Sequence, residues 1–293
     1  MGFSTTRLKQ VVYQANTVRI YTSRKDHEIP MNFATTVLLG AIAGFTIYLG
    51  VPIARFKNLS RAWQAFLNAL ATGVLIFLLW DILTKAAEPI SAALDTANHG
   101  ESAAFIILLF LFATGFGVGL LGLVAFESRW LRPTALDVHG QEATPAQLAL
   151  MIAVGIGLHN FSEGLAIGQA SRSGALSLAT VLIIGFALHN ATEGFGIAGP
   201  LTGAPRPSWA FLGLVGLIGG GPTFLGTVLG YSVQSEPVFV LCLALAAGSI
   251  LYVIGELLHV GRRFKLRELA MWGIFLGFLA GYGTDLFLTW GGA

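Results

Sequence analysis

Eight long apolar runs divide this chain of 293 residues. A helix needs about 20 mostly apolar residues to cross the hydrocarbon core of a bilayer, and each run is long enough. Charged residues make up only 11% of the chain, which argues against a water-soluble enzyme. The sequence therefore predicts an all-α integral membrane protein with eight transmembrane helices. The predicted spans are residues 32–54, 62–83, 103–125, 146–170, 174–199, 208–232, 237–258 and 270–290.

Basic residues in the breaks between these runs predict the orientation. The loops after the first, third, fifth and seventh runs hold ten lysines and arginines, whereas the opposite loops hold two, Lys85 and Arg172. Cytoplasmic loops are enriched in lysine and arginine. We therefore expect both termini outside, in a plasma (cell inner) membrane. The ten are Arg55, Lys57, Arg61, Arg129, Arg132, Arg206, Arg262, Arg263, Lys265 and Arg267.

Residues 1–30 precede the first run and carry five further basic residues. They lack the apolar core of a signal peptide. We interpret them as a basic extension that is either mobile or upstream sequence read from an early start codon, and residues 31–293 as one eight-helix domain. The net charge of +2 is scattered along the chain, so nothing favours nucleic acid as a partner.

A polar motif interrupts the fourth run and recurs in the fifth. The sequence LHNFSEG at 158–164 is followed thirty residues later by LHNATEG at 188–194. Positions four residues apart lie about 40° apart around a helix, so His159 and Glu163 share one face. Two neighbouring antiparallel helices with these faces turned toward each other would gather imidazoles, carboxylates and amides. The candidate metal ligands are His159, Asn160, Glu163, His189, Asn190 and Glu193.

The cost of these side chains in a membrane favours a bound ion. A charged group near the bilayer centre costs about 3 kcal/mol or more. A single histidine or asparagine can serve as a hydrogen bond between helices, but packing does not require the same polar set twice. A divalent cation would neutralise the carboxylates and satisfy the imidazoles. Nitrogen and oxygen ligands suit zinc and also iron(II), manganese and cadmium, and the lack of thiolates disfavours copper(I).

A second repeat aligns two acidic residues. The sequence ATGVLIFLLWDIL at 71–83 matches AAGSILYVIGELL at 246–258, which pairs Asp81 with Glu256. The second helix then corresponds to the seventh and the fourth to the fifth, as in an inverted-topology repeat. Under the predicted topology, Asp81 lies near the outer end of its helix and Glu256 near the inner end of its own. The two acids then either flank a central site or reach water by snorkelling.

These patterns resemble the bacterial ZIP (Zrt/Irt-like) divalent metal transporters. HNFSEG, HNATEGFGIAGP and AAGSILYVIGELL in the fourth, fifth and seventh runs carry the resemblance, which extends from residue 31 to the end. It implies a 3+2+3 helix arrangement with inverted-repeat symmetry, outward termini and uptake of zinc, iron or manganese toward the cytoplasm. It also implies a metal site between the fourth and fifth helices, at the six candidate ligands.

The chain departs from the family pattern at three positions. Ser162 and Thr192 stand where many members have proline, which predicts less broken helices at the site. Thr223 stands where well-studied bacterial members have a glutamate of the sixth helix that completes a second metal site. We therefore expect one metal ion, or one bound tightly and one loosely.

The resulting hypothesis is a metal transporter and not an enzyme. Metal enters past Asp81, exchanges water for the ligands of the fourth and fifth helices, and leaves past Glu256 and His259. Thr223 and Asp285 are further candidates for the pathway or a gate, with Asp285 fitting a cavity or a helix end equally well. The transported Zn²⁺, Fe²⁺, Mn²⁺ or Cd²⁺ is cargo, and no cofactor is expected. Divalent metal ions and the lipid bilayer are the expected partners, with a homodimer left open.

Two other classes of protein remain open at this stage. Histidine and glutamate four apart on facing helices could hold two metals as in di-iron bundles, which would make an intramembrane metal-dependent enzyme. The HExxH protease motif is absent, and a catalytic cysteine, tyrosine or serine is not evident. A metal-gated channel or receptor would share the ligands but show no saturable flux.

Overall fold

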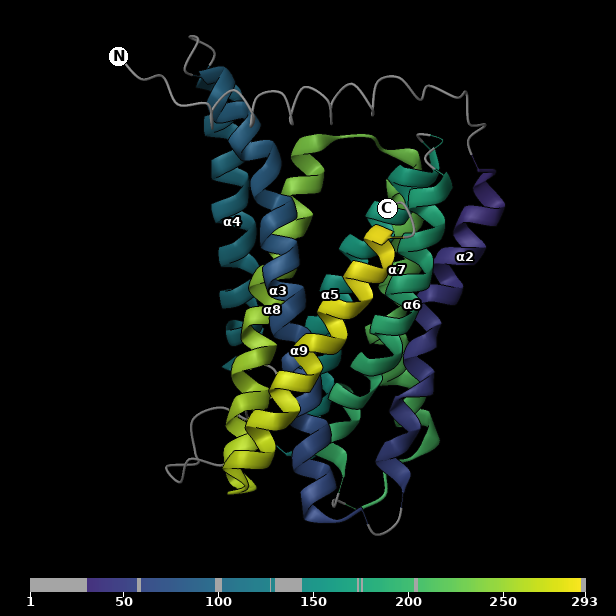
Figure 1. The fold of residues 1–293 in the computed structure, drawn as a ribbon, viewed down its shortest axis with the longest axis vertical. Helices are drawn as coiled ribbons and strands as arrows, with labels where there is room; N and C mark the ends of the chain where they lie inside the picture. The colour runs from purple at the N-terminus through teal and green to yellow at the C-terminus, as the bar shows by residue number, and fades with distance from the viewer. Residues whose placement is uncertain are drawn as a thin grey trace, which may run out of the picture.

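The computed structural model describes residues 31–56, 59–97, 102–126, 128–129, 144–172, 174, 176–202 and 205–290, and the regular structure in these ranges is helical (Figure 1). The predicted extension 1–30 and most of the loop at 127–143 lie outside the described residues. The long helices are α2 (Phe33–Phe45), α3 (Arg61–Ala97), α4 (Ser102–Phe126), α5 (Pro145–Arg172), α6 (Leu176–Ala198), α7 (Trp209–Ser232), α8 (Glu236–Arg263) and α9 (Arg267–Trp290).

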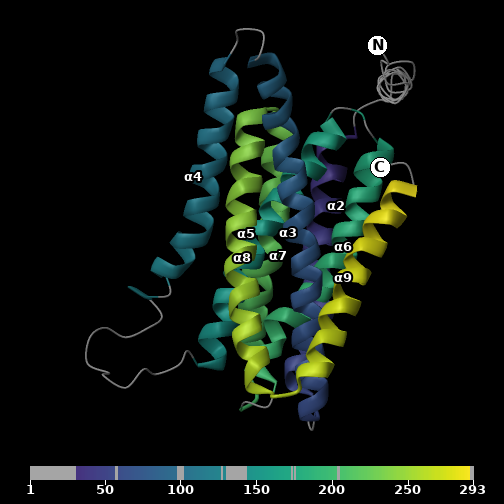
Figure 2. The ribbon, with the colours of Figure 1, turned by 60° about the vertical axis from the view of Figure 1, so that its left-hand side comes forward.

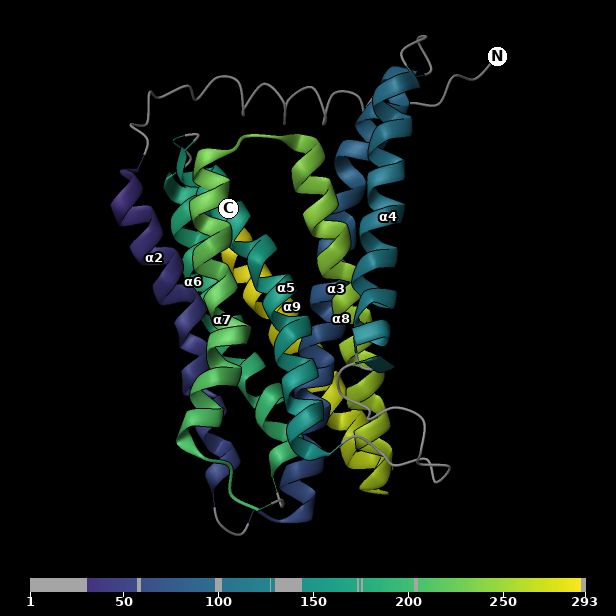
Figure 3. The same ribbon diagram turned by 180° about the vertical axis from the view of Figure 1, so that it is seen from behind.

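Successive helices run in alternate directions along one bundle (Figures 1 and 3). As a result α2 begins and α9 ends at the same end of the bundle, which we call the upper end after its place in Figure 1. Within the described ranges, seven helical segments are long and apolar enough to cross a membrane. The helix outside that set is α6, which carries the second polar motif. It runs beside α5 and α2 through the same part of the bundle.

The first predicted span is not one regular helix. Asn32 caps the start of α2 by accepting hydrogen bonds from the backbone N–H groups of Ala34 and Thr35, at 2.8 and 3.2 Å. After Phe45 the chain continues as two short 3₁₀ helices, η1 (Thr46–Leu49) and η2 (Val51–Arg55). Gly50 separates them, and its backbone lies against α6. The tighter 3₁₀ geometry lets this segment pass close beside the second motif.

The second helix is longer than its apolar run. The run ends at residue 83, but α3 continues to Ala97 because residues 84–97 are rich in alanine and other helix-forming residues. Figure 2 shows α3 and α4 extending past the neighbouring helices at the upper end. Two predictions were therefore wrong. Asp81 lies inside the helix and not near its outer end, and Lys85 lies in the same helix and not in a loop.

Glycines bring particular helices into backbone contact. A Cβ atom added at Gly164 of α5 would overlap the carbonyl oxygen of Thr223 in α7, and one added at Gly226 of α7 would overlap that of Phe161 in α5. Gly119 and Gly248 play the same role between α4 and α8. Gly73 and Gly277 do so between α3 and α9. These three helix pairs also make the most extensive helix–helix contacts in the described structure.

The contacts divide the helices into two groups. One group holds α2, α5, α6 and α7, and the other holds α3, α4, α8 and α9. They meet where α5 lies against α8 and α6 against α3. Toward the lower end this boundary is filled by apolar side chains with at most 1% of their surface exposed, among them Ile152, Ile156, Val253 and Leu257. At the upper end, residues 233–235 link α7 of the first group to α8 of the second.

Candidate metal centre

The two motifs face each other across α5 and α6, as the sequence predicted. His159 lies at the centre, with its Nε2 atom 3.1 Å from Oε1 of Glu163 and 3.5 Å from Oε1 of Glu193. The first of these contacts joins residues four apart on α5, and the second crosses to α6. All six candidate ligands are buried, with no more than 6% of any residue exposed.

The asparagines join the two motifs. Asn160 donates hydrogen bonds to the side-chain oxygen of Asn190 and to the carbonyl oxygen of Gly219 in α7, the latter at 2.9 Å. Asn190 in turn donates to Oε2 of Glu163 at 3.4 Å and to the carbonyl of Phe186 at 2.9 Å. The amides therefore hold α5, α6 and α7 together around the carboxylates.

Both motif helices are continuous, which confirms the expectation drawn from Ser162 and Thr192. Each hydroxyl donates a 2.7 Å hydrogen bond to a backbone carbonyl three residues earlier, Ser162 to His159 and Thr192 to His189. The backbone carbonyl of each motif histidine therefore accepts a hydrogen bond from a hydroxyl of its own motif. The repeat thus extends beyond the ligands to the local backbone contacts.

The glycine that ends each motif has a packing role that the sequence reasoning missed. Gly164 lies against the backbone of α7, and Gly194 lies against the backbone of Ile47 and Gly50 in the 3₁₀ segment. Each glycine follows the motif glutamate directly, so a close backbone contact fixes the helix one residue from the carboxylate. The signal was present in the sequence as the repeated EG pair.

Several buried nitrogen and oxygen atoms of the site make no hydrogen bond to the described residues. They include Nδ1 of His159 and both ring nitrogens of His189. Leaving a buried polar atom without a partner costs about 1–3 kcal/mol. Imidazole nitrogen and carboxylate oxygen are the donors that zinc and similar divalent ions bind. The chemistry of the set therefore fits a divalent cation.

The present side-chain positions do not form a coordination shell. No group of three or more histidine, cysteine, aspartate or glutamate side chains in the described residues is arranged to hold a metal ion. The carboxylates of Glu163 and Glu193 approach the imidazole of His159 instead.

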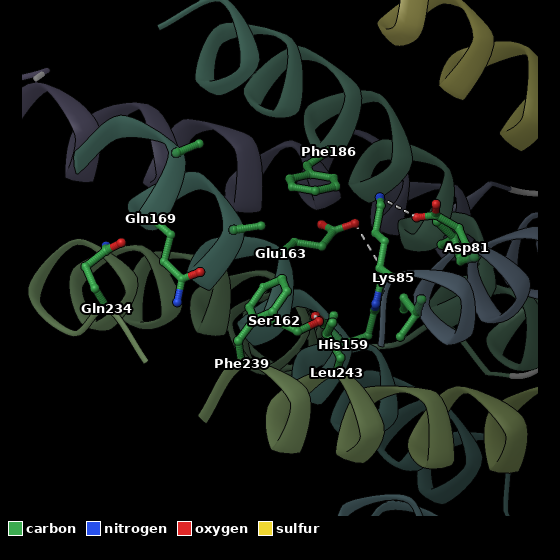
Figure 4. A pocket seen from close by; sticks show the side chains of 14 residues that line it. Asp81, Lys85, His159, Ser162, Glu163, Gln169, Phe186, Gln234, Phe239 and Leu243 are labelled. Atoms are coloured by element: carbon green, nitrogen blue, oxygen red, sulfur yellow. Dashed lines mark hydrogen bonds and ion pairs between the residues drawn. The ribbon is translucent and has the colours of Figure 1, made fainter. Parts of the chain in front are cut away.

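A cavity of about 420 Å³ reaches the site from the upper half of the bundle, at the boundary between the two helix groups. It is lined by α3, α5, α6 and α8 and by the α7–α8 link. The lining includes His159, Ser162 and Glu163 of the first motif, together with Gln169 farther along α5 and Gln234 of the link (Figure 4). Among the described side chains of α6, Phe186 lines the cavity, whereas His189 and Glu193 do not.

The cavity also contains an ion pair. Nζ of Lys85 lies 2.7 Å from Oδ2 of Asp81, and both side chains line the cavity (Figure 4). The sequence predicts a pathway role for Asp81 but places Lys85 in a loop. The available signal was the spacing of four residues, which places the two charges on one face of a helix.

The other pathway candidates do not line this cavity. Thr223 is fully buried in α7, packs against Gly44 of α2, and its hydroxyl has no hydrogen-bond partner in the described structure. Glu256 and His259 lie in the lower part of α8, where His259 is exposed with its Nε2 atom 3.2 Å from the Arg263 guanidinium. Asp285, near the upper end of α9, interacts electrostatically with Asp81 and Lys85.

Comparison with known proteins gives two matches. The sequence model of the ZIP zinc transporter family matches residues 133–282, about half of the chain, which include both polar motifs. The zinc transporter ZupT of Enterobacter sp. (strain 638) is 28% identical over 253 residues, which cover 82% of this chain and 92% of that protein.

Proposed function

The chain belongs to the ZIP zinc transporter family, and from this premise we propose that it carries zinc across the plasma (cell inner) membrane into the cytoplasm. The family and the apolar helices make it a multi-pass membrane protein that transports divalent metal ions. Iron(II), manganese and cadmium are further candidate substrates, because imidazole and carboxylate ligands bind them as well. The observation that carries the proposal is the facing pair of buried His-Asn-Glu motifs, the first of which lines a cavity.

The proposed transport site consists of His159, Asn160, Glu163, His189, Asn190 and Glu193. Buried imidazoles and carboxylates without full hydrogen bonding support this assignment, because a divalent cation would satisfy them. We propose one principal metal ion, since Thr223 offers only a hydroxyl where a second site would use a carboxylate. Eight transmembrane helices, the inverted repeat and the 3+2+3 arrangement belong to the same proposal.

The proposed route starts at the upper end of the bundle. The excess of basic residues in the lower loops favours a cytoplasmic lower end, so the cavity faces outward. A hydrated ion enters past Asp81 and exchanges water for the ligands. Release toward Glu256 and His259 requires the apolar boundary around Ile152 and Val253 to open. We propose that the helices carrying the ligands move relative to the others to open it.

The test is metal uptake by purified protein in liposomes loaded with a metal-sensitive dye. Wild-type protein should give saturable uptake of Zn²⁺, and both Glu163→Ala and His189→Ala should reduce it. Glu88→Gln is the matched control, since Glu88 is an exposed acid of α3 outside the cavity. Metal binding without flux would contradict transport and favour an enzyme or receptor. Flux that never saturates would favour a channel.

A further inference from the structure

A second cavity, which we call the lower cavity, lies at the lower end of the bundle, away from the metal centre. It has a volume of about 440 Å³ and lies between α3, α8 and α9 of the second helix group. Residues 264–266 join α8 to α9 beside it, and both helices are apolar enough to span a membrane (Figure 1). A turn between two spans lies at a bilayer surface, so the lower cavity lies at the level of phospholipid headgroups.

Three basic side chains meet at the lower cavity. Arg262 belongs to the last turn of α8, Lys265 to the turn, and Arg267 begins α9. All three are exposed, and none makes an ion pair or a side-chain hydrogen bond with the described residues. No acidic residue of the described structure lines this cavity. Basic loops are common on one side of a membrane protein, but three cations on one cavity without an acid form a site that attracts an anion.

The backbone of Lys265 has a conformation that favours glycine. Its φ angle is 56°, in the left-handed region, just after the end of α8. Glycine usually occupies such a position, because a side chain there costs free energy that glycine avoids. Residues held in this conformation cluster at ligand-binding sites. The lysine side chain at this position therefore calls for a role outside the turn itself.

The wall of the lower cavity away from the cations is apolar. On α9, Met271 and Ile274 continue it from Arg267 toward the middle of the bundle. Arg267 and Met271 also line a neighbouring hollow on α9 together with Trp272 and Phe275, whose side chains are exposed. Tryptophan is enriched at this level of a membrane. Positive charge beside an apolar surface matches the two parts of a phospholipid, whereas a soluble phosphate would use only the charge.

A buried amide forms part of the wall on α3. Asn68 is 1% exposed, and its Nδ2 atom donates a hydrogen bond to the carbonyl oxygen of Leu257 at 2.9 Å. Its Oδ1 atom has no hydrogen-bond partner in the described structure. An amide oxygen accepts hydrogen bonds, so it suits a ligand that brings a hydroxyl group as well as a phosphate. The headgroup of phosphatidylglycerol combines a negative phosphodiester with hydroxyl groups.

We propose that the lower cavity binds the headgroup of an anionic phospholipid, with its phosphate held by Arg262, Lys265 and Arg267. An acyl chain then lies along the apolar side of α9. Basic pockets between membrane helices bind anionic headgroups in this way. The bound lipid joins α8 and α9 to α3 and stabilises the second helix group. This inference goes beyond the proposed function and does not depend on which ion the protein carries.

The test measures lipid binding to the purified protein in neutral detergent by native mass spectrometry and by thermal unfolding. Wild-type protein should bind phosphatidylglycerol more tightly than phosphatidylcholine and should unfold at a higher temperature when phosphatidylglycerol is added. Arg262→Gln and Arg267→Gln should each weaken phosphatidylglycerol binding about five-fold, the effect of one basic residue near an anionic surface. Arg206→Gln is the matched control, because Arg206 is an exposed arginine between α6 and α7, at the same end of the bundle and outside the lower cavity.

Lys265→Gly separates a lipid site from a purely structural role. It removes the ammonium group and places glycine in the left-handed turn, so the unfolding temperature without lipid should stay the same or rise while phosphatidylglycerol binding weakens. Unchanged phosphatidylglycerol binding in this variant would overturn the inference. So would equal binding of the two lipids by the wild type, or an Arg206→Gln variant that loses as much binding as Arg262→Gln. If millimolar inorganic phosphate stabilised the protein as much as phosphatidylglycerol does, the site would belong to a soluble anion and not to a lipid.

Discussion

The two polar motifs have the same residues at the same spacing, yet they have different surroundings. His159 and Glu163 of the first motif line the cavity and contact each other. His189 and Glu193 of the second do not line it, and the His189 ring makes no hydrogen bond to the described residues. The first motif therefore borders the cavity, whereas His189 and Glu193 of the second do not. Two copies of one sequence motif can therefore have different surroundings in the folded protein.

The largest expected effect is the loss of the first motif. Glu163→Gln removes a carboxylate of the cavity wall, its contact with His159 and the charged acceptor of Asn190. Uptake at low zinc concentration should fall by about 100-fold or more, since even residues outside the ligand shell are worth 10–100-fold. His159→Ala should match it. Ser162→Ala is the control, because Ser162 lines the same cavity without being a proposed ligand.

Substitutions in the second motif should reduce zinc uptake less than substitutions in the first motif do. We expect His189→Ala and Glu193→Gln to reduce uptake at low zinc concentration by about 10-fold or more, since a ligand is worth at least as much as the residues that support it. Dose–response curves for zinc uptake, measured for all four single variants, test the difference. Equal losses from the two motifs would mean that the asymmetry seen in the cavity has no functional consequence.

The motif glycines should behave alike in both copies. Gly164→Ala and Gly194→Ala each force a methyl group against neighbouring backbone, and overpacking of this kind costs about 1–3 kcal/mol. Thermal unfolding in detergent should show both variants destabilised. Gly196→Ala is the control on the same helix as Gly194, because its nearest neighbouring atom would lie 3.4 Å away. Wild-type stability in either variant would show that the helix contact can relax.

The smallest effect is expected at the two hydroxyls. Ser162→Ala and Thr192→Val remove equivalent hydrogen bonds to the histidine carbonyls. Each should change stability by less than about 1 kcal/mol, because those carbonyls keep their helical partners. Unfolding curves should shift equally for both variants. A large shift in only one of them would show that the two motifs also differ in how much these backbone hydrogen bonds stabilise the protein.

The sequence predicted the helices because apolar runs and turn residues mark them directly. It missed the last part of α3, because residues 84–97 form a helix without being apolar enough to extend the run. Because the predicted helix ended at residue 83, Lys85 was expected in a loop, and its ion pair with Asp81 was not predicted. Helical periodicity placed the histidine and glutamate of each motif on one face of its helix, and the resemblance to the ZIP family implied that the two faces meet. The sequence could not predict which motif lines the cavity. That depends on how α5 and α6 pack against α3 and α8.

The link between α7 and α8 limits how the protein can open at the upper end. Only residues 233–235 join the two helix groups there, and fully extended they reach about 10 Å. Gln234 of this link lines the cavity, so the short link lies at the cavity wall and connects the two helix groups there. Any separation of the groups must therefore be small at the upper end and larger below. The lower end, where longer connections join the groups, has more freedom to part.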